Sequence, residues 1–286
     1  SRRWPVVEPG GETGGENGGE TGDAVDLRRP CTVHLVGVGG AGISAIAWCV
    51  SQLKAPTWEW LLIVPIAIAG NFVEWGMHMH VMHRLKDVFA LRAIYDRHTR
   101  QHHQYFTDND VEIHSVKEFR IVFFPWRVLI VLAVASAVFG YTASLVLGPN
   151  AGFMFPITMI GHYMVYETFH VCCHLPENAF VRNAPFISTI RRHHTAHHNM
   201  GIMMHLNMNL TFPVADWFMN TSDLNRGLLG HLFNGYDETH QKPELKPLMA
   251  KFRTAKVEEE RVTLEGPKLG DEEIAALSAA GRVVQV

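Results

Sequence analysis

Histidine is the residue whose number and spacing in this chain point to chemistry. The 286-residue sequence holds 18 histidines, and 14 of them lie between His78 and His198. Most fall into four clusters that read HMHVMH, HTRQHH, HVCCH and HHTAHH and begin at residues 78, 98, 170 and 193. Neutral imidazole is a good ligand for zinc, copper, iron and nickel ions. The clusters therefore predict a site for transition metals.

The spacing within the clusters suggests which histidines act together. Residues three or four apart lie on one face of an α-helix. The pairs expected on this basis are His98 with His102, His170 with His174, and His194 with His197 and His198. With His78, His83 and His103 these clusters offer ten imidazoles, which are more than one ion can coordinate, so we expect two ions. A histidine-rich storage tract would instead be low in complexity and carried on a loop.

Apolar segments between the clusters indicate what positions them. Residues 58–77 are about as long as a bilayer crossing requires and have tryptophans at both ends. Residues 121–148 form a longer apolar run that is expected to enter the membrane near Trp126, and a tight turn at 148–150 leads into a return segment, 151–169. Residues 41–53 are apolar but short for a span. We predict an all-α integral membrane protein with three to four transmembrane helices.

The basic residues of the chain predict how these helices are oriented. The segment from His78 to Arg120 carries seven arginines and lysines, whereas the turn at 148–150 carries none. The positive-inside rule therefore places residues 78–120 in the cytoplasm and the turn on the other side. All four clusters then share one face, in a cytoplasmic histidine-rich helical cap. The membrane would be the bacterial inner membrane, or the endoplasmic reticulum in a eukaryote.

The two ends of the chain are polar. Residues 1–30 contain the Gly/Glu-rich stretch GGETGGENGGETG, which is expected to be a disordered tail. Residues 241–286 are predicted to be a polar C-terminal tail, and residues 56–240 the membrane-embedded catalytic domain. The net charge of −3 gives no indication of a nucleic-acid partner. The four cysteines form no paired framework.

Residues 31–55 form a short segment that contains a glycine motif. The stretch TVHLVGVGGAGISAIA looks like the opening of a muramate–amino acid ligase, with Gly37, Gly39 and Gly42 in G-x-G-x-x-G spacing. A dinucleotide site requires a complete βαβ unit and an acidic residue about 20 positions further on. The first apolar span begins at about Trp58 and leaves no room for one. We expect a truncated, fused or chimeric segment that binds no nucleotide.

The order and spacing of the clusters resemble the histidine boxes of the fatty acid hydroxylase superfamily, which includes sterol desaturases and sphingolipid hydroxylases. The boxes in this chain are H-x4-H from His78, H-x3-HH from His98, H-x3-H from His170 and H-x2-HH from His194. The stretch RRHHTAHHNMG followed by NLTFPVADWFMNT is similar to the family's region after the last box. The resemblance covers roughly residues 56–225.

The resemblance implies a non-haem di-iron oxygenase that uses O2 to hydroxylate or desaturate a C–H bond of a lipid taken from the bilayer. It implies two iron ions, for which zinc can substitute on purification, and zinc lacks the redox change that the reaction needs. The implied ligands are His78, His83, His98, His102, His103, His170, His174, His194, His197 and His198. His80 and His193 match no ligand position and are expected to support the site or to face solvent.

Further residues are candidates for supporting roles. His162 and Glu167 are ionisable groups inside the last apolar segment, where such groups usually face the interior of a bundle. Asn209 and Asp216 match polar positions of the family's segment after the last box, and a role in orienting the ligands is expected. Side chains that could line a path for lipid are Gly70, Phe72, Phe153 and Phe155.

The electrons for such a reaction must come from another protein. The haem motif of a fused cytochrome b5 domain and ferredoxin-like cysteine runs are absent from the sequence. The expected partner is a separate ferredoxin, or a cytochrome b5 with its reductase, and the basic segment from Arg84 to Arg100 is a candidate docking surface. A carotenoid hydroxylase or ketolase is an alternative with the same chemistry. A membrane metal-ion transporter is the alternative from another class.

Overall fold

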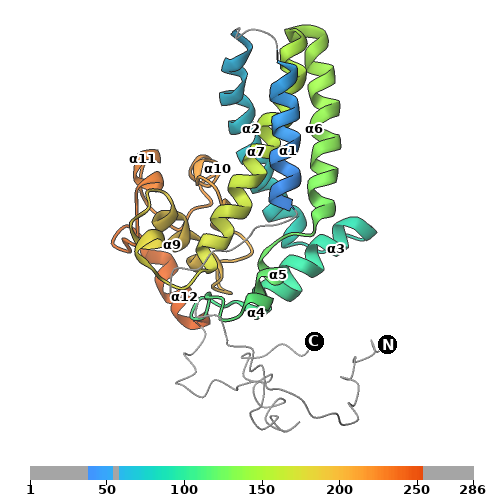
Figure 1. The fold of residues 1–286 in the computed structure, drawn as a ribbon. Helices are drawn as coiled ribbons and strands as arrows, with labels where there is room; N and C mark the ends of the chain where they lie inside the picture. Colours follow the sequence, from blue (N-terminus) through green and yellow to red (C-terminus); the bar gives the residue numbers. More distant parts are fainter. Residues whose placement is uncertain (1–37, 54–57, 254–286) are drawn as a thin grey trace, which may run out of the picture.

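The computed structural model describes residues 38–53 and 58–253, and within these ranges the chain is helical without any strand. An upper bundle of long helices stands on a lower cap of short ones (Figure 1). The bundle consists of α1 (Val38–Gln52), the 3-10 turn η1 (Trp58–Leu62), α2 (Ile63–Met77), α6 (Trp126–Leu147) and α7 (Pro149–His174). The prediction of an all-α fold is confirmed for the described residues.

The cap is built from segments that leave the lower ends of the bundle helices. The first part comprises the π-helical turn η2 (His78–Met82), α3 (Phe89–Arg97), the π-helical turn η3 (His98–His102), α4 (His103–Tyr105), η4 (Val116–Glu118) and α5 (Phe119–Val122). The second part comprises α8 (Ala179–Asn183), α9 (Ile187–His197), α10 (Val214–Phe218), α11 (Leu228–Leu232), η5 (Pro243–Leu245) and α12 (Lys246–Phe252).

Two mainly helical stretches, Trp58–Met82 and Val116–Leu147, are long and apolar enough to cross a membrane. Their apolar side chains lie mainly on the surface, since only 22% of the most apolar window of each stretch is buried. A helix in the core of a soluble protein would be mostly buried. Contiguous apolar surface of this extent marks a site of contact with lipid or protein.

The α6–α7 hairpin turns where the sequence predicted a tight turn. Gly148 ends α6 with a φ of 102°, which a residue without Cβ adopts readily, and Pro149 begins α7. Further along α7, Pro156 lies inside the helix and has no N–H to donate to the carbonyl of Gly152. That carbonyl oxygen faces Gly140 of α6, where a Cβ would collide with it. The absence of a side chain at Gly140 therefore allows the two helices to approach closely.

Helix α1 contains the second half of the glycine motif. Gly42 lies against α7, and a Cβ added there would be 2.7 Å from Sδ of Met164. This glycine thus serves the packing of α1 on α7. Residues 32–37 of the motif are outside the described residues, as are the predicted tail at 1–30 and the chain from 254 onward. At the other end, α12 packs on the cap through the buried Met249.

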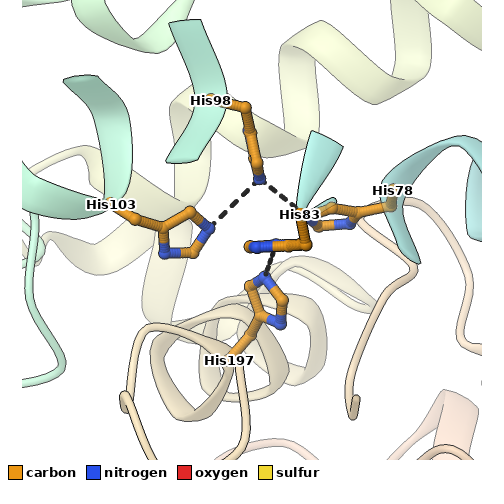
Figure 2. A group of neighbouring side chains, drawn as sticks. All are labelled: His78, His83, His98, His103 and His197. Atoms are coloured by element: carbon orange, nitrogen blue, oxygen red, sulfur yellow. Dashed lines mark hydrogen bonds between the residues drawn. The ribbon is translucent and has the colours of Figure 1, made fainter. Parts of the chain in front are cut away.

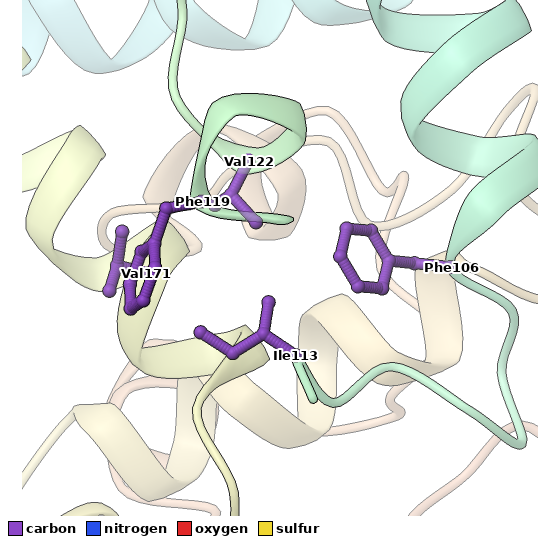
Figure 3. Packing of buried hydrophobic residues seen from close by; sticks show 5 residues of the cluster. All are labelled: Phe106, Ile113, Phe119, Val122 and Val171. Carbon is purple, nitrogen blue, oxygen red and sulfur yellow. The ribbon is translucent and has the colours of Figure 1, made fainter. Parts of the chain in front are cut away.

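The lower end of α7 connects the bundle to the cap. The guanidinium of Arg191 in α9 donates to the carbonyls of Cys172, Cys173 and Leu175, and it forms an ion pair with Glu112 at 3.0 Å. These carbonyls have no partner within the helix, and a cation at a helix C-terminus is favourable. Helices α5 and α7 contribute to an apolar cluster, shown in Figure 3, formed by Phe106, Ile113, Phe119, Val122 and Val171. It joins the first part of the cap to α7.

Candidate metal centre

Two π-helical turns determine which histidines can act together. In η2 the backbone N–H of His83 donates to the carbonyl of His78, and in η3 that of His103 donates to the carbonyl of His98. Such i→i+5 turns are rare and occur mostly at functional sites. They bring residues five apart onto the same side of the helix. Each turn therefore directs both ends of its H-x4-H spacing toward the same point.

The imidazoles gather into two groups. The first histidine group comprises His78, His83, His98, His103 and His197, and Figure 2 shows these five rings directed toward a common centre. The second histidine group comprises His102, His174, His194 and His198. Within each group the ligand nitrogens all lie within 4.8 Å of one another. Both groups have the geometry to hold a metal ion.

His170 is the tenth histidine that the resemblance implies as a ligand. Its Nε2 lies 3.2 Å from Nε2 of His102, beside the second histidine group, and its ring is buried. All ten implied ligands therefore lie together at the base of the bundle. Every one of them is at most 8% exposed.

Two of the pairs expected from α-helical spacing are wrong. His98 belongs to the first group and His102 to the second, because η3 is a π-helical turn that brings His98 together with His103. His194 and His198 face the second group, but His197 faces the first. The chain thus distributes neighbouring histidines between two centres rather than pairing them at one.

Burial keeps the imidazoles neutral. Desolvation, with the neighbouring rings adding to it, lowers the pKa of His102, His103, His194 and His197 well below the ordinary value. Burial also lowers the pKa of His198 to about 4. A neutral imidazole is the form that binds metal, so the site is prepared for ligation at neutral pH.

In several rings Nε2 faces the neighbouring imidazoles and is the inner nitrogen, whereas Nδ1 points away and is the outer nitrogen. The partner of the outer nitrogen shows whether the inner one carries a lone pair. Nδ1 of His174 donates to the carbonyl of Val111 at 2.6 Å, and Nδ1 of His198 donates to that of Phe106 at 2.8 Å. A carbonyl only accepts, so in the neutral ring the proton is on Nδ1 and Nε2 is a bare acceptor. Both acceptors lie 3.0 Å from Nε2 of His194, which can donate to only one of them.

The first histidine group repeats this arrangement. Nδ1 of His197 donates to the carbonyl of Leu206 at 2.8 Å, and Nδ1 of His78 donates to that of Met208. Nδ1 of His83 lies 3.4 Å from the hydroxyl of Thr99, which itself donates to a carbonyl. Nε2 of His197 is therefore an acceptor, and it lies 3.0 Å from Nε2 of His83, which donates to it in one of its two tautomers. In the other tautomer both nitrogens are free to bind a cation.

The distances between the inner nitrogens fit metal ligation. Nitrogens that bind one ion at about 2.1 Å and at right angles to each other are about 3.0 Å apart. The closest Nε2 pairs lie between 2.8 Å, for His78 with His98, and 3.2 Å, for His170 with His102. The all-imidazole donor set, its burial and its spacing therefore suit transition-metal ions such as iron or zinc.

A polar stripe on α2 anchors the loop that follows the last histidine cluster. Glu74 accepts hydrogen bonds from the backbone N–H groups of Leu210 and Thr211 and from the Thr211 hydroxyl. Asn71, one turn above, bonds to Thr211 and to the carbonyl of Phe212 at 2.7 Å. These bonds hold the loop that contains Met208, whose carbonyl oxygen orients the ring of His78. Asn71 and Glu74 of α2 therefore help to position the first histidine group.

Asn209 and Asp216 hold this loop from its other side, as a supporting role requires. The Asp216 carboxylate accepts from the backbone N–H groups of Met208 and Asn209, and it lies 3.0 Å from Nε2 of His193. Burial opposes the charge, but the hydrogen bonds from His193 and the backbone leave the pKa of Asp216 below its ordinary value. His193 is thus a buried supporting residue. His80 is exposed and contacts Trp75.

Arg192 ties α9 to the outer part of the cap. Its guanidinium forms a bidentate ion pair with the buried Asp223 at 2.6 and 2.7 Å and a second pair with Glu238 at 2.8 Å. Asp223 also accepts from Asn207, whose side chain bonds to the carbonyl of His193. The helix that supplies His194, His197 and His198 is therefore held rigidly on its outer side.

A small cleft opens between the two histidine groups. His98, His102 and His170 form its inner wall, and the opposite wall is the run from Ile121 to Phe124 together with Arg97. Glu167 lies behind this wall, where one carboxylate oxygen accepts from the backbone N–H of Phe124 at 3.3 Å. Glu167 is therefore near the centre without being part of either group. The cleft has a volume of about 10 Å³, which is room for about one water molecule, between His98 of the first group and His102 of the second.

The remaining candidates lie in helix contacts. His162 pairs with Glu74 at 2.9 Å and links α7 to α2 above the site. Gly70 packs against Met159, and Phe72 packs against Phe218 with ring centroids 5.5 Å apart. Phe153 contacts Trp48, and Phe155 lies beside Gly140. These four residues lie in contacts between helices, and none of them lines the cleft.

Sequence reasoning missed Asn71, Glu74, Arg191 and Arg192 as supports of the site. A signal for Glu74 was present, since a carboxylate in an apolar run of span length usually faces a polar partner inside the bundle. The two arginines precede a histidine cluster directly, and they read as ordinary basic residues. Their partners lie 16 to 79 residues away in sequence.

Searches of protein-family models, of curated proteins and of solved structures gave no match to this chain.

Proposed function

We propose that this chain is a membrane-embedded di-metal oxygenase of the fatty acid hydroxylase type. In this proposal the two histidine groups, with His170, hold two iron ions. The substrate is a lipid of the bilayer, and the product is its hydroxylated or desaturated form. For hydroxylation the balance is R–H + O2 + 2 electrons + 2 protons → R–OH + H2O, so an external reductant is required.

The observation that carries the proposal is the convergence of ten buried imidazoles around two adjacent centres. Adjacent inner nitrogens are 2.8 to 3.2 Å apart. The outer hydrogen bonds leave Nε2 of His78, His174, His197 and His198 with a free lone pair for an ion. No carboxylate belongs to either group among the described residues. A structural histidine seldom needs a second imidazole as its inner partner, whereas a ligand does. Transport of metal ions favours ligands spread along a path, whereas these ten are gathered at one end of the bundle.

The residues of the chain perform three tasks in this proposal. The outer hydrogen bonds to the carbonyls of Val111, Phe106, Leu206 and Met208 orient the imidazoles before an ion arrives. The run from Ile121 to Phe124 covers His98, His102 and His170 on one side and limits the access of water to them. Bound iron would supply the redox chemistry that allows O2 to attack an unactivated C–H bond.

We further propose that the bundle spans the membrane and that the cap lies in the cytoplasm. Helices α2 and α6, which belong to the stretches Trp58–Met82 and Val116–Leu147, are two of the crossings, and α7 returns beside them as a third. Helix α1 is too short to cross at about 1.5 Å per residue and is embedded in part of the bilayer. A separate ferredoxin or cytochrome b5 then reaches the cap from the cytoplasm.

The experiment is a turnover assay with the purified full chain in lipid. Protein loaded with iron receives a lipid extract, 18O2 and either no reductant or a reduced ferredoxin system, and products are identified by mass spectrometry. We expect one labelled oxygen per hydroxylated product, or a mass loss of two hydrogens on desaturation, and only with the reductant. Sustained turnover without a reductant would contradict the proposal, as would failure to bind iron. Labelled carotenoids as the sole products would assign the alternative substrate class.

A further inference from the structure

The cap carries a group of exposed apolar side chains on and around α10 and α11. We call it the apolar lip, and it consists of Trp217, Phe218, Met219, Leu229, Phe233 and Tyr236. Their exposed fractions run from 39% for Trp217 to 73% for Leu229. Single exposed apolar residues are common on soluble proteins, but a contiguous set of this size marks a contact surface.

Charged side chains lie at the edge of the lip and are sparse within it. Lys242 donates to the exposed Asn220 at 3.0 Å, and Asp237 and Glu238 follow Tyr236. Between residues 214 and 236 the charged residues are Asp216, Asp223 and Arg226, and the two aspartates are buried. Arg226 is half-buried and bonds to Asn234. The exposed side chains of the same stretch are the lip residues and two asparagines. A surface that meets water would intersperse charges, as α12 does with its two exposed apolar residues, Leu248 and Phe252, among Lys246, Lys251 and Arg253.

Ring contacts give the depth of the lip relative to the bundle. Phe218 packs edge-on against Phe72 of α2, and Phe72 lies within the stretch that is apolar enough to cross a membrane. Phe72 precedes His78 by six residues, which is about 9 Å of helix. Phe233 connects through Phe186 and Phe212 to Phe169 of α7, with ring centroids 5.0 to 5.7 Å apart.

The orientation of the two short helices agrees with these contacts. In Figure 1, α10 and α11 form the part of the cap that rises beside the bundle, whereas α12 lies at the opposite, lower end. The lip therefore continues the exposed apolar surface of α2, which includes Val64, Ile68 and Val73. Lipid that covers α2 at the level of Phe72 would also reach the lip.

We propose that the apolar lip is inserted into the lipid bilayer, so that the cap is anchored in the membrane in addition to the spans. The inference rests on the proposed membrane embedding of the bundle, and it is independent of the proposed chemistry. Aromatic side chains at the boundary of a bilayer are favoured, and an apolar face with its charges at the edge gains from leaving water. The occupant of this face is lipid rather than a second protein.

Spin labels test the proposal in the full chain reconstituted in phosphatidylcholine vesicles. Single cysteines replace Leu229 or Phe233 in a chain that also carries Cys31→Ser, since Cys49, Cys172 and Cys173 are buried. Val138→Cys on the exposed side of α6 is the control for lipid, and Leu248→Cys on α12 is the control for water. The readout is the ratio of collision rates with O2, which concentrates in lipid, and with a water-soluble nickel chelate.

We expect the ratio at positions 229 and 233 to exceed that at 248 several-fold and to resemble that at 138. A lipid-like ratio at position 138 together with ratios at 229 and 233 that equal the ratio at 248 would contradict insertion of the lip. That result would leave the membrane embedding of the bundle intact. A water-like ratio at 138 would overturn both. Protection from both reagents at 229 and 233 would indicate coverage by protein, and it would also overturn the proposal.

Discussion

The outer hydrogen bond of each anchored imidazole is what distinguishes this site from a histidine-rich surface. Nδ1 of His174, His197 and His198 donates to a carbonyl that belongs to a different segment of the cap. The ring is therefore fixed before an ion binds, and little rotamer entropy is lost on ligation. Such residues are sensitive to substitution although they contribute no apolar packing.

Removal of one inner imidazole from each group is the direct test at this scale. We expect His102→Ala and His197→Ala each to lower the metal content per chain and to abolish turnover, because a buried centre then lacks a ligand. The measurement is elemental analysis of the purified protein together with the turnover assay. His80→Ala is the matched control, since His80 lies in the same cluster as His78 but is exposed, and it should retain metal and activity. Full activity in His197→Ala would remove the proposed centre.

At the scale of the helix, Gly140 and Pro156 act as a pair across the α6–α7 contact. Pro156 leaves the Gly152 carbonyl without its helical partner, and Gly140 provides the space into which that oxygen points. A polar group of this kind inside the bundle is tolerated because neighbouring helices accommodate it. The close contact of the two helices therefore depends on the absence of a side chain at position 140.

We expect Gly140→Ala to destabilise the protein by about 2 kcal/mol, because the new methyl group meets a backbone oxygen that cannot move aside. Gly161→Ala in α7 is the matched control. A Cβ at Gly161 meets nothing within 4 Å, and alanine favours a helix over glycine by about 1 kcal/mol. Thermal unfolding in detergent is the measurement. An unchanged midpoint in Gly140→Ala would show that the helices are not in close contact there.

The sequence predicted these helices well and their mutual contacts poorly. The start of α6 at Trp126 and the turn at Gly148 follow from local signals, since Pro125 and Gly148 interrupt an apolar run. The pairing of His98 with His103 does not, because it requires an i→i+5 turn that no local residue specifies. In the same way, the bonds of Glu74 to Leu210 and Thr211 join residues 136 and 137 positions apart. The resemblance predicted which ten histidines belong to the site, and only the tertiary structure divided them into groups.

At the scale of the molecule, charge and apolar surface are separated. Most exposed residues of α2 and α6 are apolar, whereas the segment from Arg84 to Arg100 presents Arg84, Lys86, Arg92 and Arg100 to solvent. Asp96 contacts two of these arginines. In the proposed reaction, such a basic surface would attract an acidic electron donor.

Reversal of charge on this segment tests the docking surface. We expect Arg84→Glu with Lys86→Glu to raise the KM for a reduced ferredoxin about tenfold at low salt, with kcat at saturating donor unchanged. The difference should shrink as salt screens the charges. Lys246→Glu with Lys251→Glu on α12 is the control and should leave KM unchanged. A change confined to kcat would place the effect on the metal centre instead.

The adjacency of His102 with His103, and of His197 with His198, has a thermodynamic consequence. In each of these dipeptides one ring belongs to the first histidine group and the other ring to the second. In the proposed di-metal site, a change at one centre that displaces η3 or α9 therefore also moves ligands of the other, and linkage makes this effect mutual. Removal of a ligand from one centre, through His102→Ala or His197→Ala, should then also weaken the affinity of the other centre for its ion. A metal titration of each variant measures this effect.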